Sequence, residues 1–396
     1  MHRTGKKRRG RAAAITAALA AATALTLAGC SSSSASPAAS GTVAAGGIDL
    51  ASVCPANIVV QTSWYPQAET GYLFELIKDK YTVDPGKKSV SGPLATPDGT
   101  TGVNLEIRAG GPAIGFQQPA SQMYTDPTIT LAIVGSDQAL QQSAKFATLT
   151  VFAGLDKAPL IVLWDPATYP DAKTIKDLGP AMKKKGGVLL YSQGQSYVDY
   201  LISSGQLTKS EVDGSYDGTP ATFIAAGGKD ATQAYSTNEA YTYPNIISQW
   251  KKPVAYQLLA DAGWDTYPDS LSIRAGDKDK LAPCLKKLVP IFQQANVDFF
   301  KDPSGASKVI LDQVKAFNSG DTYDQGTIDA AVKTMLDEKL AGNGSDGATG
   351  DFDMDRLQAF FTTATPIFEA EGSTPAKDAT PQTLFTNEFI DTSIGF

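Results

Sequence analysis

Residues 58–77 read IVVQTSWYPQAETGYLFELI, and this stretch decides the fold. Residues 58–61 are a short, mainly apolar run, which indicates a strand. The aromatic loop at residues 64–66 follows, and apolar residues then recur at helical spacing from Tyr72 to Ile77. A strand, a loop and a helix in this order are typical of α/β layers.

The alternation of strand and helix continues along the chain. We predict further strands over residues 103–107, 129–134, 149–152, 160–163 and 188–191. Ser136 and Ser196 are placed to cap the helices that follow two of these strands. Beyond Lys280 the sequence turns helical, with apolar residues on one face of each segment. Together these patterns predict an α/β fold with mostly parallel sheets flanked by helices.

The N-terminal segment has the pattern of a secretory leader. Six basic residues precede an uncharged apolar run over residues 12–28, and the run leads into Leu27-Ala28-Gly29-Cys30. This tetrapeptide resembles the bacterial lipobox. We therefore expect residues 1–29 to be a lipoprotein signal peptide, and a lipid on Cys30 to anchor the protein outside the bacterial cell membrane. The alternative is an ordinary leader with an incidental cysteine.

Residues 30–47 are rich in Ser, Ala and Gly and carry no charge, so we expect a flexible tether. The folded part then begins at residue 48. Its length favours two lobes over one, because single cores rarely grow beyond about 250–300 residues.

Removal of the leader changes the charge and the chemistry that remain available. Of 34 lysines and arginines, six lie in the leader, which leaves 28 basic residues against 41 acidic ones and a net charge of −13. Nucleic acid is therefore not an expected partner. The single histidine, His2, also lies in the leader. Its loss excludes a Ser-His-Asp or Cys-His catalytic pair and a zinc site built on imidazole.

Two cysteines, Cys54 and Cys284, remain after the leader. In an exported protein they favour one disulfide, the alternative being two buried thiols. The sequence Asp351-x-Asp353-x-Asp355 begins like a calcium loop but lacks the required Gly and Glu, so we interpret it as an acidic helix start. No phosphate-binding or nucleophile-elbow motif is present. We expect neither a metal nor a cofactor.

Four segments carry a resemblance to a known family: residues 61–71, 213–218, 233–241 and 384–389. They are similar to segments of type II periplasmic-binding proteins, in the branch of receptors for thiamine-pyrimidine precursors, sulfonates and nitrate. The resemblance implies a two-lobed fold with a ligand cleft between the lobes. It assigns residues 48–156 and 254–396 to lobe 1 and residues 157–253 to lobe 2, with hinges at residues 156–159 and 250–253.

The resemblance also implies a function without catalysis. The expected protein is a solute-binding lipoprotein, a monomer that closes on a small molecule and delivers it to the permease and ATPase of an ABC importer. A sensing lipoprotein without a permease is an alternative. A pyrimidine-synthesising enzyme of the same superfamily is disfavoured, because that reaction needs a histidine that the mature chain does not have.

Candidate ligand-binding residues lie in loops that follow predicted strands and in the family-like segments 213–218 and 233–241. They are Trp64, Tyr65, Glu69, Gly110, Gly111, Asp137, Ser192, Gln193, Ser196, Tyr216, Asp217, Glu239 and Tyr241. Each also has a structural alternative, such as core packing for the aromatic residues, a tight turn for the glycines and a helix cap for the serines.

The candidate loops also suggest what the ligand is. They combine aromatic rings and carboxylates but contain no Lys or Arg. Carboxylates oppose an anion, so the loops favour a flat, nitrogen-bearing, pyrimidine-like heteroaromatic compound over a sulfonate or nitrate.

Overall fold

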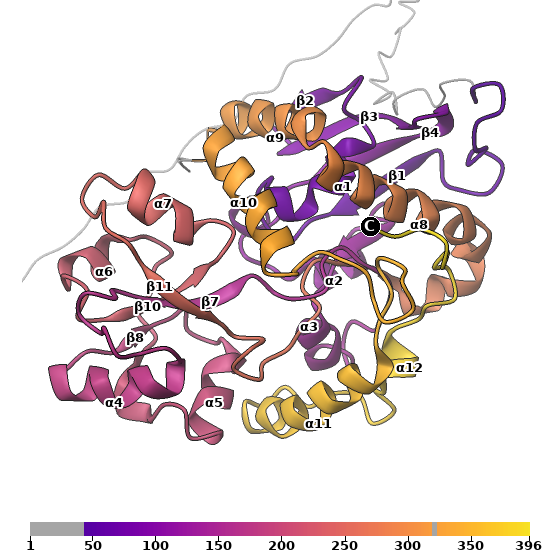
Figure 1. Cartoon of the computed structure of the whole chain (residues 1–396). Helices are drawn as coiled ribbons and strands as arrows, with labels where there is room; N and C mark the ends of the chain where they lie inside the picture. The colour runs from indigo at the N-terminus through magenta and orange to yellow at the C-terminus, as the bar shows by residue number, and fades with distance from the viewer. Residues whose placement is uncertain (1–42, 319–322) are drawn as a thin grey trace, which may run out of the picture. The chain divides into compact units, whose positions relative to one another are not determined.

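The computed structural model describes residues 43–318 and 323–396. The expected signal peptide, the lipidated Cys30 and most of the expected tether lie outside these residues. Within them the chain forms two β-sheets with helices packed around each (Figure 1). The α/β class predicted from the sequence is confirmed.

The seven-stranded sheet is formed by two stretches of the chain, one that precedes and one that follows the residues of the five-stranded sheet. In spatial order its strands are β2 (Thr82–Asp84), β3 (Ser89–Thr96), β4 (Gly99–Arg108), β1 (Asn57–Gln61), β5 (Leu131–Ile133), β12 (Ser270–Arg274) and β6 (Thr148–Ala153). The central strands are buried along most of their length, as expected for apolar runs covered by helices.

The five-stranded sheet is formed by the middle of the chain. Its strands, in spatial order, are β11 (Ala255–Leu258), β7 (Leu160–Trp164), β10 (Ala231–Tyr235), β8 (Leu189–Leu190) and β9 (Val212–Asp213). The sheet thus extends to Leu258, past the boundary at residue 253 that we expected from the sequence. The chain passes between the two sheets at residues 154–159 and again at residues 259–269. The first crossing contains the expected hinge at residues 156–159, but the second lies beyond the expected hinge at residues 250–253, which precedes β11. That the crossings act as hinges stays a prediction.

Both sheets are mixed, which corrects the expectation of mostly parallel sheets. Of the ten strand pairings in the described residues, four are parallel. Some antiparallel pairings belong to hairpins, as in β2-β3-β4. Others arise where one strand lies between two neighbours that both run in the opposite direction. Strand β12 is of the second kind, because it enters from the five-stranded sheet and pairs antiparallel with both β5 and β6.

The helices divide between the sheets (Figure 1). The five-stranded sheet is accompanied by α4 (Ile175–Lys185), α5 (Ser196–Ser203), α6 (Ala221–Ala225) and α7 (Glu239–Asn245). The remaining helices are α1 (Gly71–Glu75), α2 (Pro119–Thr125), α3 (Ser136–Gln141), α8 (Lys278–Lys301), α9 (Ser304–Phe317), α10 (Gln325–Asp337), α11 (Met354–Ala370) and α12 (Pro381–Leu384), with short 3₁₀ turns η1 (Ala68–Thr70), η2 (Gly111–Ile114), η3 (Lys209–Glu211) and η4 (Ala275–Asp277). Helix α10 packs against α7 and η1, and helix α11 packs against α5 and α3. These two helices therefore contact elements that accompany both sheets.

The predicted helix faces are mostly correct. In α8 the four apolar residues of the predicted face are all buried: Leu285, Leu288, Val289 and Phe292. In α10 the face ends at Met335, and Leu336 is 41% exposed. Neither serine caps its helix, since the N-caps of α3 and α5 are Gly135 and Gln195, without a side-chain bond. The acidic helix start is confirmed, because the Asp353 carboxylate accepts from the backbone N–H groups of the next turn of α11.

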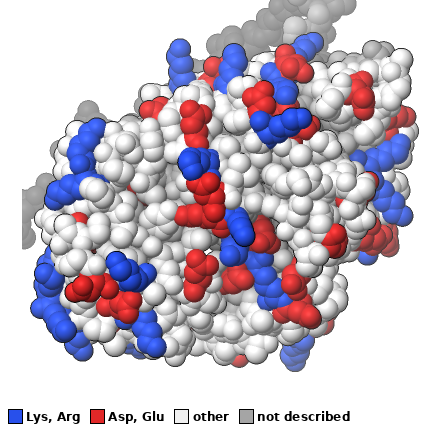
Figure 2. Space-filling model, in the orientation of Figure 1, with Lys and Arg blue, Asp and Glu red and all other residues white. Residues whose placement is uncertain are grey.

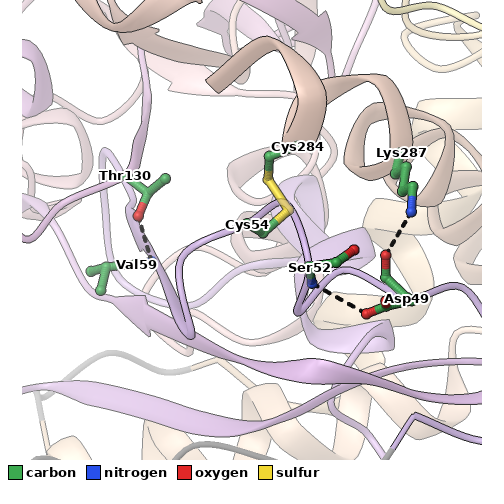
Figure 3. The surroundings of a disulfide bond; sticks show 7 residues. All are labelled: Asp49, Ser52, Cys54, Val59, Thr130, Cys284 and Lys287. Carbon is green, nitrogen blue, oxygen red and sulfur yellow. Dashed lines mark hydrogen bonds between the residues drawn. A yellow bond between two sulfur atoms is a disulfide. The ribbon is translucent and has the colours of Figure 1, made fainter. Parts of the chain in front are cut away.

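A disulfide joins Cys54, in the segment before β1, to Cys284 on α8, with the two Cα atoms 4.7 Å apart (Figure 3). Nearby, Lys287 of α8 donates from Nζ to the backbone carbonyl of Asp49 at 2.8 Å. The same segment also pairs with the sheet, since Leu50 N–H donates to the Thr101 carbonyl. The start of the described chain is therefore bonded to β4 by a backbone hydrogen bond and to α8 by the disulfide and the Lys287 hydrogen bond. Even Ala44, inside the expected tether, donates its N–H to the Thr100 carbonyl.

Acidic and basic side chains are interspersed on the face drawn in Figure 2, and no broad patch of Lys and Arg is visible there. Among the described residues, no helix is long and apolar enough to span a membrane.

Candidate functional site

The candidate site begins in the loop that follows β1. The apolar run of β1 is buried in the seven-stranded sheet, and its carboxyl end delivers the chain to η1, where Glu69 lies. Glu69 Oε1 accepts a hydrogen bond from Thr237 Oγ1 at 2.5 Å. Thr237 follows β10 of the five-stranded sheet. One carboxylate thus connects elements of both sheets, and burial raises its pKa.

Glu239 lies two residues beyond Thr237, in the first turn of α7. Its Oε2 accepts from the Tyr235 backbone N–H at 2.8 Å, and its Oε1 accepts from Asn238 Nδ2 at 2.9 Å. These bonds lower its pKa, but burial has the larger effect and, with the nearby Glu69, raises it to about 7. Glu239 is among the ligand-binding residues predicted from the sequence, and its carboxylate is desolvated.

Asp137 reaches the site from the first turn of α3, which follows β5. Its Oδ1 accepts from the Gln138 backbone N–H at 2.8 Å. Burial raises its pKa against the effect of this bond. Glu69, Asp137 and Glu239, all predicted from the sequence, are therefore acids held in desolvated positions.

A fourth acid, Asp269, was missed from the sequence. It directly precedes β12, whose first residue, Ser270, pairs with Ala153 at the carboxyl end of β6. Because β12 is antiparallel to its neighbours, its beginning lies at the edge where β5 and β6 end. Burial and the charge of Glu69 raise the pKa of Asp269 to about 7.

Tyr235 marks where the four acids come together. The negative charges of Glu239, Asp269, Glu69 and Asp137 all raise the pKa of its phenol, in addition to the larger effect of desolvation. Tyr235 is also 44% exposed. We call this neighbourhood of Tyr235 and the four acids the recess. Two more tyrosines of the five-stranded sheet and its helices, Tyr216 and Tyr243, also have pKa values raised by burial and by Glu239.

Several polar atoms around the Glu69–Thr237 bond are buried without a hydrogen-bond partner among the described residues. On the side of the seven-stranded sheet they are Glu69 Oε2 and the Tyr72 hydroxyl, and on the other side they are Ser236 Oγ and Asn238 Oδ1. Buried polar atoms are normally paired, because an unpaired one costs about 1–3 kcal/mol. Seven further atoms of this kind occur elsewhere in the described residues, and these four are distinguished by lying in or next to the residues of one contact between the two sheets.

The aromatic and glycine residues of the first two predicted loops pack on one another. Trp64 is 42% exposed and stacks at 5.9 Å between ring centroids on Phe116, which is itself 68% exposed. Gly111 has a φ of +56°, and a Cβ there would lie 2.5 Å from the Trp64 ring. At Gly110 a Cβ would lie 2.1 Å from the Thr62 carbonyl oxygen. The glycines are therefore required for this close packing.

The other predicted residues are divided between the recess and the periphery. Tyr65 packs on Phe317, at 6.5 Å between ring centroids. The Ser192 backbone N–H donates to Gln233 Oε1, which also accepts from the buried Tyr197 hydroxyl. Gln193 is exposed. Ser196 donates from its hydroxyl to Glu371 of the turn that ends α11, at 2.8 Å.

Asp217 and Tyr241 each have a partner of their own in the structure. The exposed Asp217 accepts two bonds from Thr219 in a local turn, which lower its pKa. A Cβ on Gly326, at the start of α10, would lie 2.5 Å from the Tyr241 hydroxyl oxygen. Tyr241 thus belongs to the contact between α7 and α10. No group of three acids, cysteines or histidines in the described part of the chain is arranged to hold a metal ion.

No known family model matches this chain, and no curated protein matches its sequence. Solved structures do match its fold. The periplasmic sulfonate-binding protein SsuA of a putative ABC transporter from Methylobacillus flagellatus KT has a TM-score of 0.51 at 13% identity, covering 84% of this chain and 92% of that one. The periplasmic aliphatic sulphonate-binding protein SsuA from Escherichia coli has a TM-score of 0.50 at 14% identity, with the same coverage.

The periplasmic nitrate-binding protein NrtA from Synechocystis PCC 6803 also has a TM-score of 0.50, at 9% identity, over 84% of this chain and 87% of that one. These neighbours are substrate-binding proteins, and they confirm the two-lobed fold of periplasmic binding proteins that the sequence resemblance implied. At these identities the likeness concerns the fold.

Proposed function

We propose that this protein is an extracytoplasmic solute-binding lipoprotein, which captures a small molecule between its two sheets and delivers it to an ABC importer. One observation carries the proposal: the charges of acids from both sheets, together with that of Asp269 at the chain's return between them, all act on the accessible phenol of Tyr235. Chain segments far apart in the sequence thus contribute polar groups to one recess. Ligand clefts in open α/β sheets form at this place, beside the carboxyl ends of the strands.

For the ligand we propose a small, flat, nitrogen-bearing compound such as a pyrimidine. Aromatic side chains for stacking and carboxylates for accepting N–H groups support it. The alternative is a sulfonate or nitrate, the ligands named for the structural neighbours. Four desolvated acids disfavour an anion, because a like charge nearby in a medium of low dielectric costs energy.

Mass spectrometry of the small molecules released from freshly purified, denatured protein tests binding and identity together. Titration calorimetry with the identified compound then compares the parent with Trp64→Ala and Glu239→Gln, in which we expect weaker binding. Asp217→Asn, on the exposed turn, is the matched control and should bind like the parent. If both cleft variants fold and bind as tightly as the parent, the proposed cleft is wrong.

The lipid anchor is proposed from the sequence alone. Labelling cells with a radioactive or clickable fatty acid should mark the parent protein but not Cys30→Ser, which should be released or remain unprocessed. Persistence of the label in that variant would contradict the proposal. Co-purification of a permease and ATPase from mildly solubilised membranes separates an importer subunit from a sensing lipoprotein.

A further inference from the structure

The four acids of the recess have no cationic partner. Among the described residues, none of Glu69, Asp137, Glu239 and Asp269 forms an ion pair with Lys or Arg. Some carboxylates elsewhere in the described residues do have one, as Asp156 and Asp265 have in Arg356. Buried acids without a counter-charge are costly to keep in a fold. Their convergence indicates that the counter-charge comes from outside the chain.

Tyr72 adds an independent observation at the same place. Its side chain is fully buried, and its hydroxyl has no partner in the described chain. The ring is fixed between Phe152 and Phe292, at 5.3 and 6.1 Å between centroids. A Cβ built on Gly154 would lie 3.4 Å from the Tyr72 hydroxyl oxygen and 2.6 Å from the Asp269 carbonyl oxygen, so the hydroxyl is held beside Asp269.

Glu69 offers a second unpartnered atom. One of its carboxylate oxygens is bound to Thr237, whereas Oε2 is buried and free of any hydrogen bond in the described residues. Glu69 is near enough to Asp269 for the two charges to repel each other. One carboxylate oxygen of Glu69 and the Tyr72 hydroxyl are thus buried with acceptor capacity that no donor of the described chain satisfies, and the Asp269 carboxylate is close to both.

We infer that the ligand presents a positively charged N–H group, an ammonium or amidinium, to a subsite formed by Glu69, Tyr72 and Asp269. The inference rests on the proposed function, because it specifies what the cleft of a solute receptor binds. Such a group supplies the missing positive charge and donates to the unpartnered oxygens at once. A quaternary ammonium has the charge but no N–H, and a neutral amide has the N–H but no charge. A sulfonate has neither.

The test uses ligand-free protein, prepared by unfolding and refolding, and a protein-free cell extract treated with EDTA. Ion exchange separates the extract into cationic, neutral and anionic pools, and a thermal shift is measured with each pool. We expect stabilisation by the cationic pool alone. Stabilisation by the neutral or anionic pool overturns this inference but leaves the receptor in place. If no pool stabilises the protein, the proposed function itself fails.

Variants then locate the subsite. In Asp269→Asn and Glu69→Gln, we expect the apparent affinity for the cationic pool to fall at least about tenfold, as for the loss of a charged hydrogen bond. Tyr72→Phe removes a single oxygen and should weaken binding by less while the protein stays folded. Asp351→Asn is the control, because burial raises the pKa of Asp351 too, to about 6, and it does not belong to the four acids. Parent-like affinity in all three subsite variants would overturn the assignment of the subsite to Glu69, Tyr72 and Asp269. If a variant does not fold, the pool measurement on the parent still decides whether the bound compound is a cation.

Discussion

Thr237 donates a hydrogen bond from Oγ1 to Glu69 Oε1 at 2.5 Å, although the two residues are 168 positions apart. Glu69 follows a strand of the seven-stranded sheet, and Thr237 follows a strand of the five-stranded sheet. The bond therefore joins the two halves of the candidate site directly, without a ligand. It lies beside the polar atoms that remain unpartnered.

We expect Thr237→Val to destabilise the ligand-free protein by about 1–3 kcal/mol, because the valine keeps the shape but leaves Glu69 Oε1 buried and unpaired. Denaturant titration measures this change. The matched control is Thr219→Val, which removes an equivalent threonine–carboxylate bond from the exposed Asp217 and should cost no more than about 0.5 kcal/mol. Equal stability of the two variants would show that the bond between the sheets contributes nothing.

The raised pKa values predict how the stability of the ligand-free protein depends on pH. Glu239 and Asp269 have pKa values of about 7 in the fold, against ordinary values of 4.5 and 3.8. Between these limits the folded state binds more protons than the unfolded state, so their contribution is complete at low pH and is lost as the pH rises through 7. The groups that face them are Glu69 and tyrosines, and none is a cation.

Glu239→Gln should therefore be less sensitive to pH than the parent. Denaturant titrations at pH 5 and pH 8 give the difference, which we expect to be on the order of 3 kcal/mol smaller in the variant, since each pKa unit corresponds to about 1.4 kcal/mol. Acids elsewhere affect both proteins equally and cancel in the comparison. The same dependence on pH in parent and variant would refute the raised pKa.

The predicted and missed site residues differ in one physical respect. Glu69 and Asp137 follow predicted strands, and reasoning that looks just beyond the end of each strand finds them, whereas Glu239 was found through the family resemblance of residues 233–241. Asp269 precedes its strand, and it reaches the same edge only because β12 runs antiparallel to its neighbours. The direction of a strand depends on where the chain returns from the other sheet. No local pattern in the sequence records that return.

Local patterns were also insufficient at the helix starts and in one turn. Ser196 has the position of a cap, but its hydroxyl donates to Glu371 in a distant part of the chain. Asp217 sits in a loop that resembles a ligand loop, yet its carboxylate is occupied by Thr219 two residues later. The partner of Ser196 is distant in the sequence and only the tertiary structure reveals it, whereas the partner of Asp217 is local and a closer reading of the turn could have found it.

We expect reduction of the disulfide to lower the free energy of unfolding substantially. The double variant Cys54→Ser, Cys284→Ser opens a loop of 230 residues, for which the chain-entropy model gives up to about 4–5 kcal/mol of lost stability. Denaturant titration of this variant and of the parent measures the loss. Reduced parent should match the variant, which separates the bond from the substituted atoms. Two thiols that react with an alkylating reagent in unreduced, denatured parent would mean that the bond does not form.

Arg356 of α11 holds both segments that connect the two sheets. Its guanidinium donates to the Asp156 carboxylate at 2.9 Å and to the Asp265 carboxylate at 2.5 and 2.7 Å, and its Cζ lies 4.1 Å from the Tyr267 ring centroid. Asp156 belongs to the first connection, whereas Asp265 and Tyr267 belong to the second. If these segments are the hinges, Arg356 fixes their relative positions whenever the sheets open or close.

We therefore expect Arg356→Lys, which cannot keep both paired contacts, to shift the ligand-free protein toward more open conformations and to weaken ligand binding severalfold. Arg108→Lys is the matched control, because Arg108 also bridges two carboxylates, Glu106 and Asp126, but within one sheet and its neighbouring loop. Both substitutions should lower the free energy of unfolding by a similar amount, about 1–2 kcal/mol for partly exposed pairs.

Small-angle scattering with and without ligand should then separate the two variants, since only Arg356→Lys is expected to increase the radius of gyration of the ligand-free protein. An unchanged radius together with parent-like affinity in Arg356→Lys would show that this arginine stabilises the fold without controlling its closure.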